Sequence, residues 1–364
     1  MNKICERKLD TLYRKLNVFK KMFLGYPSDA DFDYSALYRF LEFPLNNIGD
    51  PSEKSAYCLQ TKDFEREVLK FFAELFHIKN HWGYITNGGT EGNLYGLYLA
   101  REILPKASVF FSEDTHYSIR KNVHLLRMKN SIIKSNSNGE MDYEDFTKKI
   151  KKHKSAVVVA NIGTTMKGAV DDVCKISGIL EKNKINYYIH ADAALYGMIL
   201  PFISEAPFDF RSKISSISVS GHKFVGSPIP CGVVLVRKEL VKTLQDYIEY
   251  INAHDTTLSG SRDAFTPLVF WYRIKTIGLE GFKKQVQYSN ELAEFLVLEL
   301  KRIGWPGVER SYITVRFQKP PEQIVKKWEL AVFKNMAHVI CLPHQTKEQL
   351  MAFITELELI QKNI

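Results

Sequence analysis

Short runs of apolar and β-branched residues alternate along the middle of the chain with longer stretches of mixed polarity. Such runs predict strands, and they occur at Trp82–Thr86, Ser108–Phe111, Ala156–Ile162, Tyr187–Ala191, Ile214–Ser220 and Gly232–Arg237. A helical pattern begins at Phe64, and further helices are expected between the strands. Because continuous apolar strands separated by helices form βα units, the pattern predicts an α/β fold with a mainly parallel sheet.

The pattern changes toward the C-terminus. A long helix runs from about Phe282 to Leu300, and Gly304-Trp305-Pro306 follows it. Beyond this turn, strands are expected at Tyr312–Phe317 and His338–Leu342, and helices around Pro321–Ala331 and Lys347–Gln361. We therefore expect an N-terminal segment over residues 1–60, a large domain over 61–285 and a small C-terminal α+β domain over 286–364.

The composition excludes several classes of protein. Of the 364 residues, 45% are apolar and 25% are charged, which is typical of a globular chain and not of a disordered or collagen-like one. No apolar run reaches the length of about 18 residues that a transmembrane helix needs. The first ten residues also lack the apolar stretch of a secretory signal. No membrane partner is expected.

Charge and cysteine content narrow the picture further. The net charge of +9 is dispersed in short basic groups, so nucleic-acid binding is not expected, and an anionic cofactor or plain solubility explains the charge better. The five cysteines are scattered and include no Cys-x-x-Cys pair: Cys5, Cys58, Cys174, Cys231 and Cys341. This pattern predicts free thiols in a reducing cytoplasm, with neither disulfides nor a metal site.

The most informative stretch for chemistry is Ser218 to Gly226, which contains Ser220-Gly221-His222-Lys223 directly after a predicted strand. A lysine at a strand end can point into a crevice, where partial burial makes its amine a carbonyl nucleophile. A Schiff base with pyridoxal phosphate (PLP) requires such a lysine. An exposed loop lysine is the ordinary alternative for this string taken alone.

An aspartate ends another predicted strand, in His190-Ala191-Asp192-Ala193-Ala194. The carboxyl ends of strands are where α/β sheets bind ligands. A buried carboxylate beside a pyridine nitrogen keeps that nitrogen protonated, so that the ring can accept electrons. The competing interpretation of Asp192 is a cap for the following helix.

Two further elements complete a pattern. The segment Thr86-Asn87-Gly88-Gly89-Thr90-Glu91-Gly92-Asn93 opens a helix, and glycines at a helix N-terminus can admit a phosphate, although a simple turn explains them as well. His116 follows the strand near Phe110 and could stack on a cofactor ring or serve only as a structural histidine. Each element is ambiguous alone, whereas their order along the chain is more specific.

These strings resemble the group II pyridoxal-phosphate-dependent amino-acid decarboxylases, which have the fold type I (aspartate-aminotransferase-like) architecture, and within them the bacterial histidine decarboxylases. The resemblance covers nearly the whole chain. It rests on Gly25-Tyr26-Pro27, Ala30–Tyr34, Asn46-Asn47, Tyr84–Asn93, Asp114–Ser118, Asn161–Thr165, His190–Leu195, Ser218–Gly232, Ala253-His254-Asp255 and Gly260-Ser261-Arg262. Plant serine decarboxylases are similar over the same length and share Gly-His-Lys-Phe-Val-Gly.

The resemblance implies a role for each matching position. Lys223 would carry PLP as a Schiff base, Asp192 would pair with the pyridine nitrogen, and His116 and Ala194 would pack on the two ring faces. The other cofactor-binding residues implied are Gly89, Thr90, Ser220 and His222 at the phosphate, Thr164 or Thr165 near the ring, and Gly260 and Ser261 at the phosphate of a homodimer partner.

The substrate side is expected to involve His116, Asn46, Asn47, Tyr250 and His254. Tyr250 or His254, in the segment 247–255, is the candidate proton donor. Asn46 and Asn47 lie in the N-terminal segment, which often covers the site in such folds; a turn that positions the helix at Phe64 is the plain alternative.

The implied reaction is PLP-dependent decarboxylation of an L-amino acid, with L-histidine giving histamine and CO2 as the first expectation. L-serine decarboxylation to ethanolamine is the alternative, followed by a non-decarboxylating PLP enzyme or a silent PLP-binding protein. Two positions depart from the resemblance. Asp263-Ala264-Phe265 stands where both families usually carry Asn-Gly-His, and Tyr196 stands where the histidine enzymes tend to have Ser.

Overall fold

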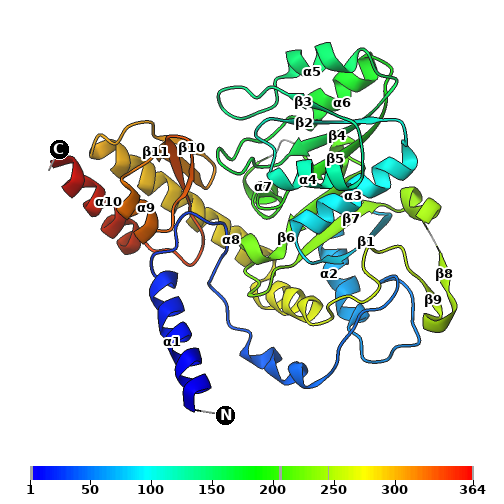
Figure 1. The fold of residues 1–364 in the computed structure, drawn as a ribbon, viewed down its shortest axis with the longest axis horizontal. Coiled ribbons are helices and arrows are strands. Elements are labelled where there is room, and N and C mark those ends of the chain that lie inside the picture. The colour runs from blue at the N-terminus through cyan, green and yellow to red at the C-terminus, as the bar shows by residue number, and fades with distance from the viewer. Residues whose placement is uncertain (1–2, 205–206, 245, 363–364) are drawn as a thin grey trace. The chain divides into compact units, whose positions relative to one another are not determined.

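The computed structural model describes residues 3–204, 207–244 and 246–362. Contacts divide the chain into two compact units, a large unit of residues 32–283 and a small unit that joins residues 1–31 to residues 284–364. The ribbon in Figure 1 follows the chain through both units by colour. The N-terminal segment expected over residues 1–60 is therefore divided between the two units.

The large unit contains a seven-stranded sheet with the strand order β1-β7-β6-β5-β4-β2-β3. Its strands are β1 (His81–Thr86), β2 (Ser108–Ser112), β3 (Asn130–Ile133), β4 (Ser155–Asn161), β5 (Asn186–Asp192), β6 (Ser216–Ser220) and β7 (Gly232–Arg237). Strand β7 runs antiparallel to both of its neighbours, and the pairings among β2 to β6 are parallel. The mainly parallel α/β sheet predicted from the apolar runs is confirmed.

Helices cover both faces of this sheet. The helices and short helical turns of the large unit include η1 (Ser35–Glu42), α2 (Lys62–Leu75), α3 (Gly89–Ile103), α4 (Tyr117–Leu125), α5 (Tyr143–Ile150), α6 (Val173–Lys182), η2 (Tyr196–Met198), α7 (Leu200–Ile203) and η3 (Phe210–Ser212). Phe111 joins Tyr95 of α3 in one apolar cluster, whereas the ring of Phe110 lies 5.9 Å from that of Phe146 on α5. Successive side chains of β2 thus pack on opposite faces, as a sheet buried on both sides requires.

The register brings several strand ends to one edge of the sheet. Asp192 pairs with Asn161 of β4 on one side and with Ser218 of β6 on the other. Gly232 pairs with both Thr86 and Ser220, so β1 and β6 end at the same level as β7 begins. The segments that the sequence singled out for chemistry therefore leave the sheet at a common edge.

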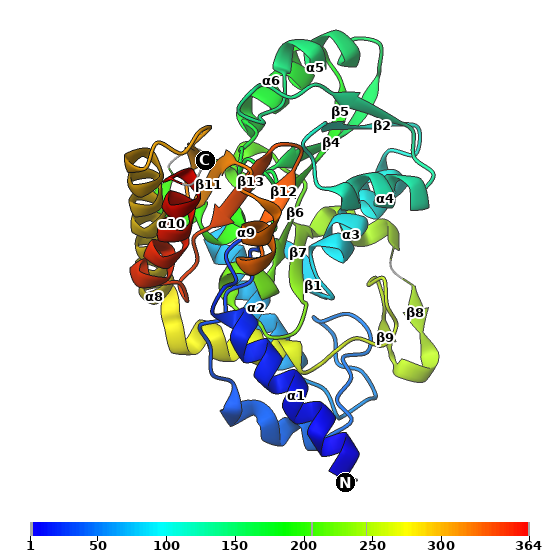
Figure 2. The same cartoon turned by 60° about the vertical axis from the view of Figure 1, so that its left-hand side comes forward.

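The small unit contains a four-stranded antiparallel sheet in the order β10-β11-β13-β12. Its elements are α1 (Lys3–Lys20), the later part of α8 (Thr266–Arg302), β10 (Glu309–Ser311), β11 (Thr314–Gln318), α9 (Glu322–Lys327), β12 (Ala331–Phe333), β13 (Met336–Ile340) and α10 (Lys347–Lys362). Figure 2 shows α9, α10 and the strands of this unit from a second direction. The α+β character predicted for it is confirmed.

One predicted element of the small unit is wrong in extent. The helix expected around Pro321–Ala331 ends at Lys327, and Ala331 begins strand β12 instead. Glu329 has a left-handed backbone with φ of 47°, which a continuing helix cannot accommodate, so the chain reverses there. Among the described residues, no helix combines the length and the apolar character needed to span a bilayer.

Candidate active site

Lys223 lies in a short π-helical turn, η4 (Gly221–Val225), directly after β6. Its backbone is not helical, with φ of −91° and ψ of −114°. A Cβ on the preceding Gly221 would lie 2.2 Å from the ring of Phe270 and 2.7 Å from Cys231 Sγ, so only glycine fits there. Burial lowers the pKa of Lys223, and the carboxylate of Asp192 opposes that shift. The turn thus presents an amine that gives up its proton more readily than an exposed lysine.

Asp192 is buried at the carboxyl end of β5. Its Oδ2 accepts a hydrogen bond of 2.8 Å from Nδ2 of Asn93 on α3, and its Oδ1 accepts one of 3.3 Å from the backbone of Ala194. These two donors fix the orientation of the carboxylate. Asp192 therefore holds a fixed position at the strand end, and its pairing with a pyridine nitrogen stays a prediction.

His116 is the N-cap of α4, and its ring is held by Ser118. The Nδ1 atom lies 2.8 Å from Ser118 Oγ and accepts a longer hydrogen bond from the Ser118 backbone. Burial lowers the pKa of His116, and Lys223 acts in the same direction while Asp192 opposes it. The three groups therefore share one electrostatic environment.

The phosphate candidates form a cradle around the start of α3. Gly88 has φ of 131°, and a Cβ on Gly89 would lie 2.7 Å from Ser220 Oγ and 3.5 Å from Cβ of Ala194. A Cβ on Gly88 would meet His222 Cε1 at 3.5 Å. The backbone of Gly89 and Thr90 at this helix N-terminus is thus lined by the residues that the resemblance assigned to the phosphate.

Thr164 and Thr165 lie on the turn between β4 and α6. The Thr164 hydroxyl accepts a hydrogen bond of 3.0 Å from the backbone N–H of Ala169 and so stabilises the turn in which it lies. Thr165 is exposed. The position of either hydroxyl relative to a cofactor ring stays a prediction.

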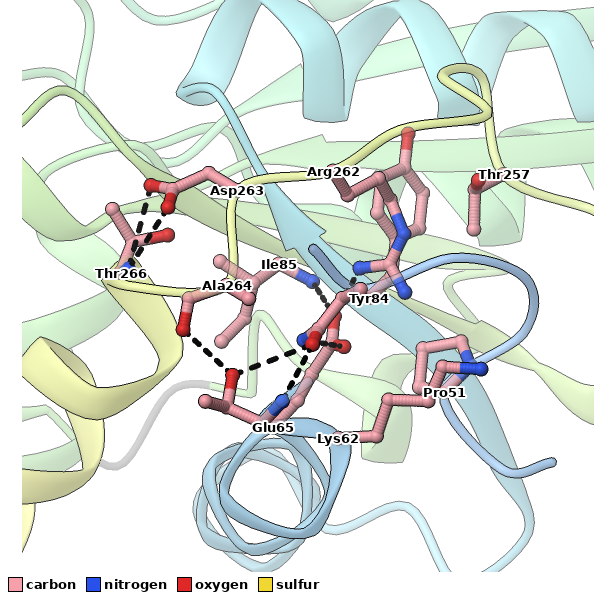
Figure 3. A network of polar contacts seen from close by, with 12 residues as sticks. Pro51, Lys62, Glu65, Tyr84, Ile85, Thr257, Arg262, Asp263, Ala264 and Thr266 are labelled. Carbon is pink, nitrogen blue, oxygen red and sulfur yellow. Dashed lines mark hydrogen bonds and ion pairs between the residues drawn. The ribbon is translucent and has the colours of Figure 1, made fainter. Parts of the chain in front are cut away.

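Asn46, Asn47 and Ser261 lie in a second polar cluster around Glu65 and Arg262. Figure 3 shows Glu65, Ile85 and Arg262 of this cluster from close by. At its centre the buried carboxylate of Glu65 pairs with the Arg262 guanidinium and accepts hydrogen bonds of 2.9 Å from Asn47 Nδ2 and from the backbone of Ile85 in β1. Asn46 Nδ2 donates to Ser261 Oγ at 3.0 Å. The cluster ties the segments around Asn46 and Ser261 to the strand that leads into the phosphate cradle.

Tyr250 and His254 lie on a β-hairpin formed by β8 (Tyr247–Ile248) and β9 (Ala253–His254). His254 Nδ1 lies 2.9 Å from a carboxylate oxygen of Glu53, whereas Tyr250 is 85% exposed. Gly260 has open space where a Cβ would be. The assignment of Tyr250 and His254 to the substrate, and of Gly260 to a partner's phosphate, therefore stays a prediction.

Local packing explains the two departures from the family pattern. Asp263 Oδ1 accepts a hydrogen bond of 2.7 Å from Phe265 N just before α8 begins, and Ala264 is fully buried with its carbonyl bound by Thr61. Tyr196 is buried, and its ring lies where a Cβ on Gly163 would be only 2.8 Å away. These residues have structural partners of their own in this chain.

Sequence reasoning missed Asn93 and Glu65 as members of these clusters. Asn93 lies inside a helix, where asparagine is disfavoured unless its amide is engaged elsewhere. Its neighbours Gly92 and Gly96 indicate a close approach of the helix to another element. These signals were present, but the partners Asp192 and Arg262 lie far away in sequence.

The residues present fit pyridoxal phosphate. The glycine cradle leaves room for an anion at a helix N-terminus, Asp192 supplies a buried carboxylate for a pyridine nitrogen, and Lys223 supplies an amine with a lowered pKa. Each of these features belongs to the large unit. One chain therefore supplies a group for the aldehyde, for the pyridine nitrogen and for the phosphate of this cofactor.

Comparison with known proteins agrees with this geometry. Residues 61–304 match the pyridoxal-dependent decarboxylase conserved domain. The chain is 45% identical to the histidine decarboxylase of Morganella morganii, over 93% of this chain and 92% of that one. It is also 45% identical to that of Mesorhizobium japonicum, over 96% of each.

Among solved structures, the L-methionine decarboxylase of Streptomyces sp. 590 superposes with a TM-score of 0.90 at 26% identity, over 98% of this chain and 95% of that one. The fold is therefore that of the fold type I PLP decarboxylases, and PLP is the cofactor. The chain belongs to the pyridoxal-dependent decarboxylase family.

Proposed function

We propose that this enzyme converts L-histidine to histamine and CO2 with PLP bound at Lys223. The observation that carries the proposal is the juxtaposition of Lys223, Asp192 and the glycine cradle at one sheet edge. Support for the substrate comes from 45% identity to proteins named histidine decarboxylase over nearly the whole chain.

When bound, PLP supplies an electron sink for the electron pair that remains after CO2 leaves. Lys223 would hold the cofactor at its aldehyde carbon, and its lowered pKa favours the neutral amine that this bond needs. Asp192 would hold the proton on the pyridine nitrogen. His116 would stack on one ring face, with its orientation fixed by Ser118, and Ala194 would pack on the other.

His222 would contribute to the phosphate through a defined tautomer. Its Nδ1 lies 3.3 Å from the backbone N of Cys231 and 3.1 Å from the carbonyl of the same residue. A phosphate at Nε2 favours the tautomer with its proton on Nε2, in which Nδ1 accepts from the Cys231 N–H. Gly89, Thr90 and Ser220 would supply the other donors.

The substrate side is proposed to include Asn46, with Tyr250 or His254 delivering the proton to Cα. Both amides are engaged on both sides, Asn47 by Thr61 N and Glu65 and Asn46 by Ser261 and Arg262 N. Asn47 is fully buried whereas Asn46 is only partly buried, which favours Asn46 as the residue that faces substrate. The exposed hydroxyl of Tyr250 suits a donor that moves, whereas His254 is paired with Glu53.

We further propose a cytoplasmic homodimer in which Gly260 and Ser261 reach the phosphate of the partner subunit. Helix α1 buries none of its residues within the chain and exposes an apolar set that a second copy could cover: Ile4, Leu9, Leu12, Tyr13, Leu16 and Phe19. The free thiols of Cys5, Cys58 and Cys174 are exposed, in keeping with a reducing compartment.

The test is to incubate the PLP-loaded enzyme with a panel of L-amino acids and to detect CO2 and amines. Histamine from histidine is expected, and Lys223→Ala should abolish it together with the absorbance of the lysine-bound cofactor. Ethanolamine from serine would keep the chemistry and change the substrate. Cofactor binding with no CO2 from any amino acid would overturn the proposed reaction.

A further inference from the structure

The amide of Asn93 uses every hydrogen-bonding position that it has. Its Nδ2 donates to Asp192 Oδ2 at 2.8 Å and, more weakly, to Ser118 Oγ at 3.5 Å. Its Oδ1 accepts from the Ser218 hydroxyl and from His190 Nε2, the latter at 2.9 Å. An asparagine amide has two donors and two lone pairs, so the group is saturated within the fold.

The Asp192 carboxylate allows only one orientation of this amide, and His190 matches it. Because Nδ2 of Asn93 faces a carboxylate, Oδ1 must face His190, and His190 must carry its proton on Nε2. The other ring nitrogen then accepts from Ser216 Oγ, 2.7 Å away. Burial lowers the pKa of His190 to about 4, so the ring is neutral at pH 7. A neutral ring can donate from Nε2 and accept at Nδ1. A flipped amide would set its oxygen against the Asp192 carboxylate, and its NH2 group would meet the Nε2 proton of His190 in this tautomer.

The helix that carries Asn93 is held unusually close to the sheet. A Cβ on Gly92 would lie 2.8 Å from Cβ of Ser218, and one on Gly96 would lie 2.3 Å from Nδ1 of His190. Both glycines lie on α3 one turn apart, on either side of Asn93 in sequence. This close packing places Asn93 within hydrogen-bonding distance of Asp192.

The same amide also reaches the stacking histidine. Ser118 Oγ, which faces Asn93 Nδ2, lies 2.8 Å from Nδ1 of His116. One buried side chain therefore links the group proposed for the pyridine nitrogen with the group proposed for the ring face.

We propose that Asn93 is the positioning residue of this active site: its amide, locked by His190, holds Asp192 in the orientation that keeps the pyridine nitrogen of PLP protonated. This inference rests on the proposed cofactor role of Asp192. It assigns Asn93 no contact with substrate, so its effect passes entirely through the cofactor.

The test uses enzyme loaded with PLP that is ¹⁵N-labelled at the pyridine nitrogen, without substrate. In the unaltered enzyme and in His190→Gln, whose amide can still donate to Asn93, the resonance should report a protonated nitrogen from about pH 6 to 9. In Asn93→Leu the nitrogen should lose its proton within that range, and the Kd for PLP should rise about 10- to 100-fold. His190→Leu should shift the resonance in the same direction by a smaller amount.

Leu180→Ala is the matched control, because it empties a fully buried site on α6 and leaves the network intact. It should lower stability without moving the resonance. An unmoved resonance in Asn93→Leu, or an equal movement in Leu180→Ala, would overturn the proposal; if Asn93→Leu fails to fold, the contrast between the two His190 variants decides it. A missing histamine product with the expected resonances would refute the proposed reaction and leave the role of Asn93 standing.

Discussion

At the scale of single residues, the site depends on groups whose protonation is set by burial. His190 is the clearest example, since burial holds its pKa at about 4 while an unfolded histidine titrates near 6.5. The folded state therefore binds fewer protons than the unfolded state between these values. It follows that the stability contribution of His190 is complete above about pH 6.5 and is lost as the pH falls toward 4.

Replacing His190 by Gln should flatten this part of the stability profile. The variant lacks the titrating ring, so its free energy of unfolding should fall less steeply than that of the unaltered enzyme, by up to about 1.4 kcal/mol per pH unit. Urea unfolding of the PLP-loaded proteins at several values between pH 7 and 4.5 measures the difference. Asp171, whose pKa burial raises to about 6, titrates in both proteins and cancels. Parallel profiles would show that His190 does not titrate as stated.

Gly96 provides a second test at this scale. Because a Cβ there would lie 2.3 Å from His190, Gly96→Ala should force α3 outward and cost about 1 to 3 kcal/mol, with weaker PLP binding. Gly178, on the exposed side of α6, has nothing within 4 Å of the same added atom. Gly178→Ala should therefore stabilise the protein by about 0.5 to 1 kcal/mol. Thermal midpoints that move in the same direction for both variants would contradict the packing argument.

Candidate residues that follow predicted strands could be identified from the sequence. Residues that become neighbours only when the chain folds could not. Lys223 and Asp192 could be singled out because Asp192 ends one strand and Lys223 follows shortly after another, and strand ends are where such sheets bind ligands. Asn93 contacts a residue 99 positions away, and no local pattern encodes that pairing. The pairing arises because α3 packs on β5 and β6, where His190, Asp192 and Ser218 contact Asn93.

At the scale of elements, the cluster around Glu65 joins α2, β1 and the segment before α8 (Figure 3). The Arg262 guanidinium also donates to the Gly49 carbonyl at 3.0 Å and lies 5.5 Å from the centre of the Tyr84 ring. Both Glu65 and Arg262 are almost fully buried as a pair. Removing one charge from such a pair leaves the other uncompensated in the interior.

Two glutamates of α2 allow this to be measured with one substitution. Glu65→Gln should lower the free energy of unfolding by about 3 to 5 kcal/mol because it leaves the buried charge of Arg262 uncompensated. Glu67, two residues along, forms an ion pair of 2.8 Å with Lys275 in which both side chains are half exposed. Glu67→Gln should cost at most about 1 kcal/mol. Equal losses in chemical unfolding would mean that the buried pair contributes no more than the surface pair.

Elements with weak local patterns were the ones that sequence could not place. Strand β3 has only two apolar residues and lies mostly exposed at the edge of the sheet, so no apolar run marks it. The two strands of the hairpin, β8 and β9, have only two residues each, too few to show an alternating pattern. The six strands with continuous apolar runs are buried almost throughout, which is why the pattern located them.

At the scale of the whole molecule, the proposed dimer predicts that two inactive variants restore activity when they are mixed. An active site contained within one chain would not give this result. If Ser261 acts at the partner's phosphate, then Lys223→Ala and Ser261→Asp damage different halves of one site. Each variant alone should be almost inactive, the second because a carboxylate repels phosphate. In a mixed dimer, one site receives both damaged residues, and the other receives intact Lys223 from one chain and intact Ser261 from its partner.

Refolding or co-expressing the two variants in equal amounts should therefore restore about a quarter of the unaltered activity, because half of the dimers are mixed and each has one intact site. Histamine production by the mixture measures it, and mixing Lys223→Ala with Asp192→Asn is the matched control. Those two residues occupy the same large unit, so that mixture should yield no intact site. No restoration by the first pair, in a preparation that light scattering shows to be dimeric, would place Ser261 in the site of its own chain or outside the site altogether. Restoration by the control pair would mean that Lys223 and Asp192 of one chain serve different sites.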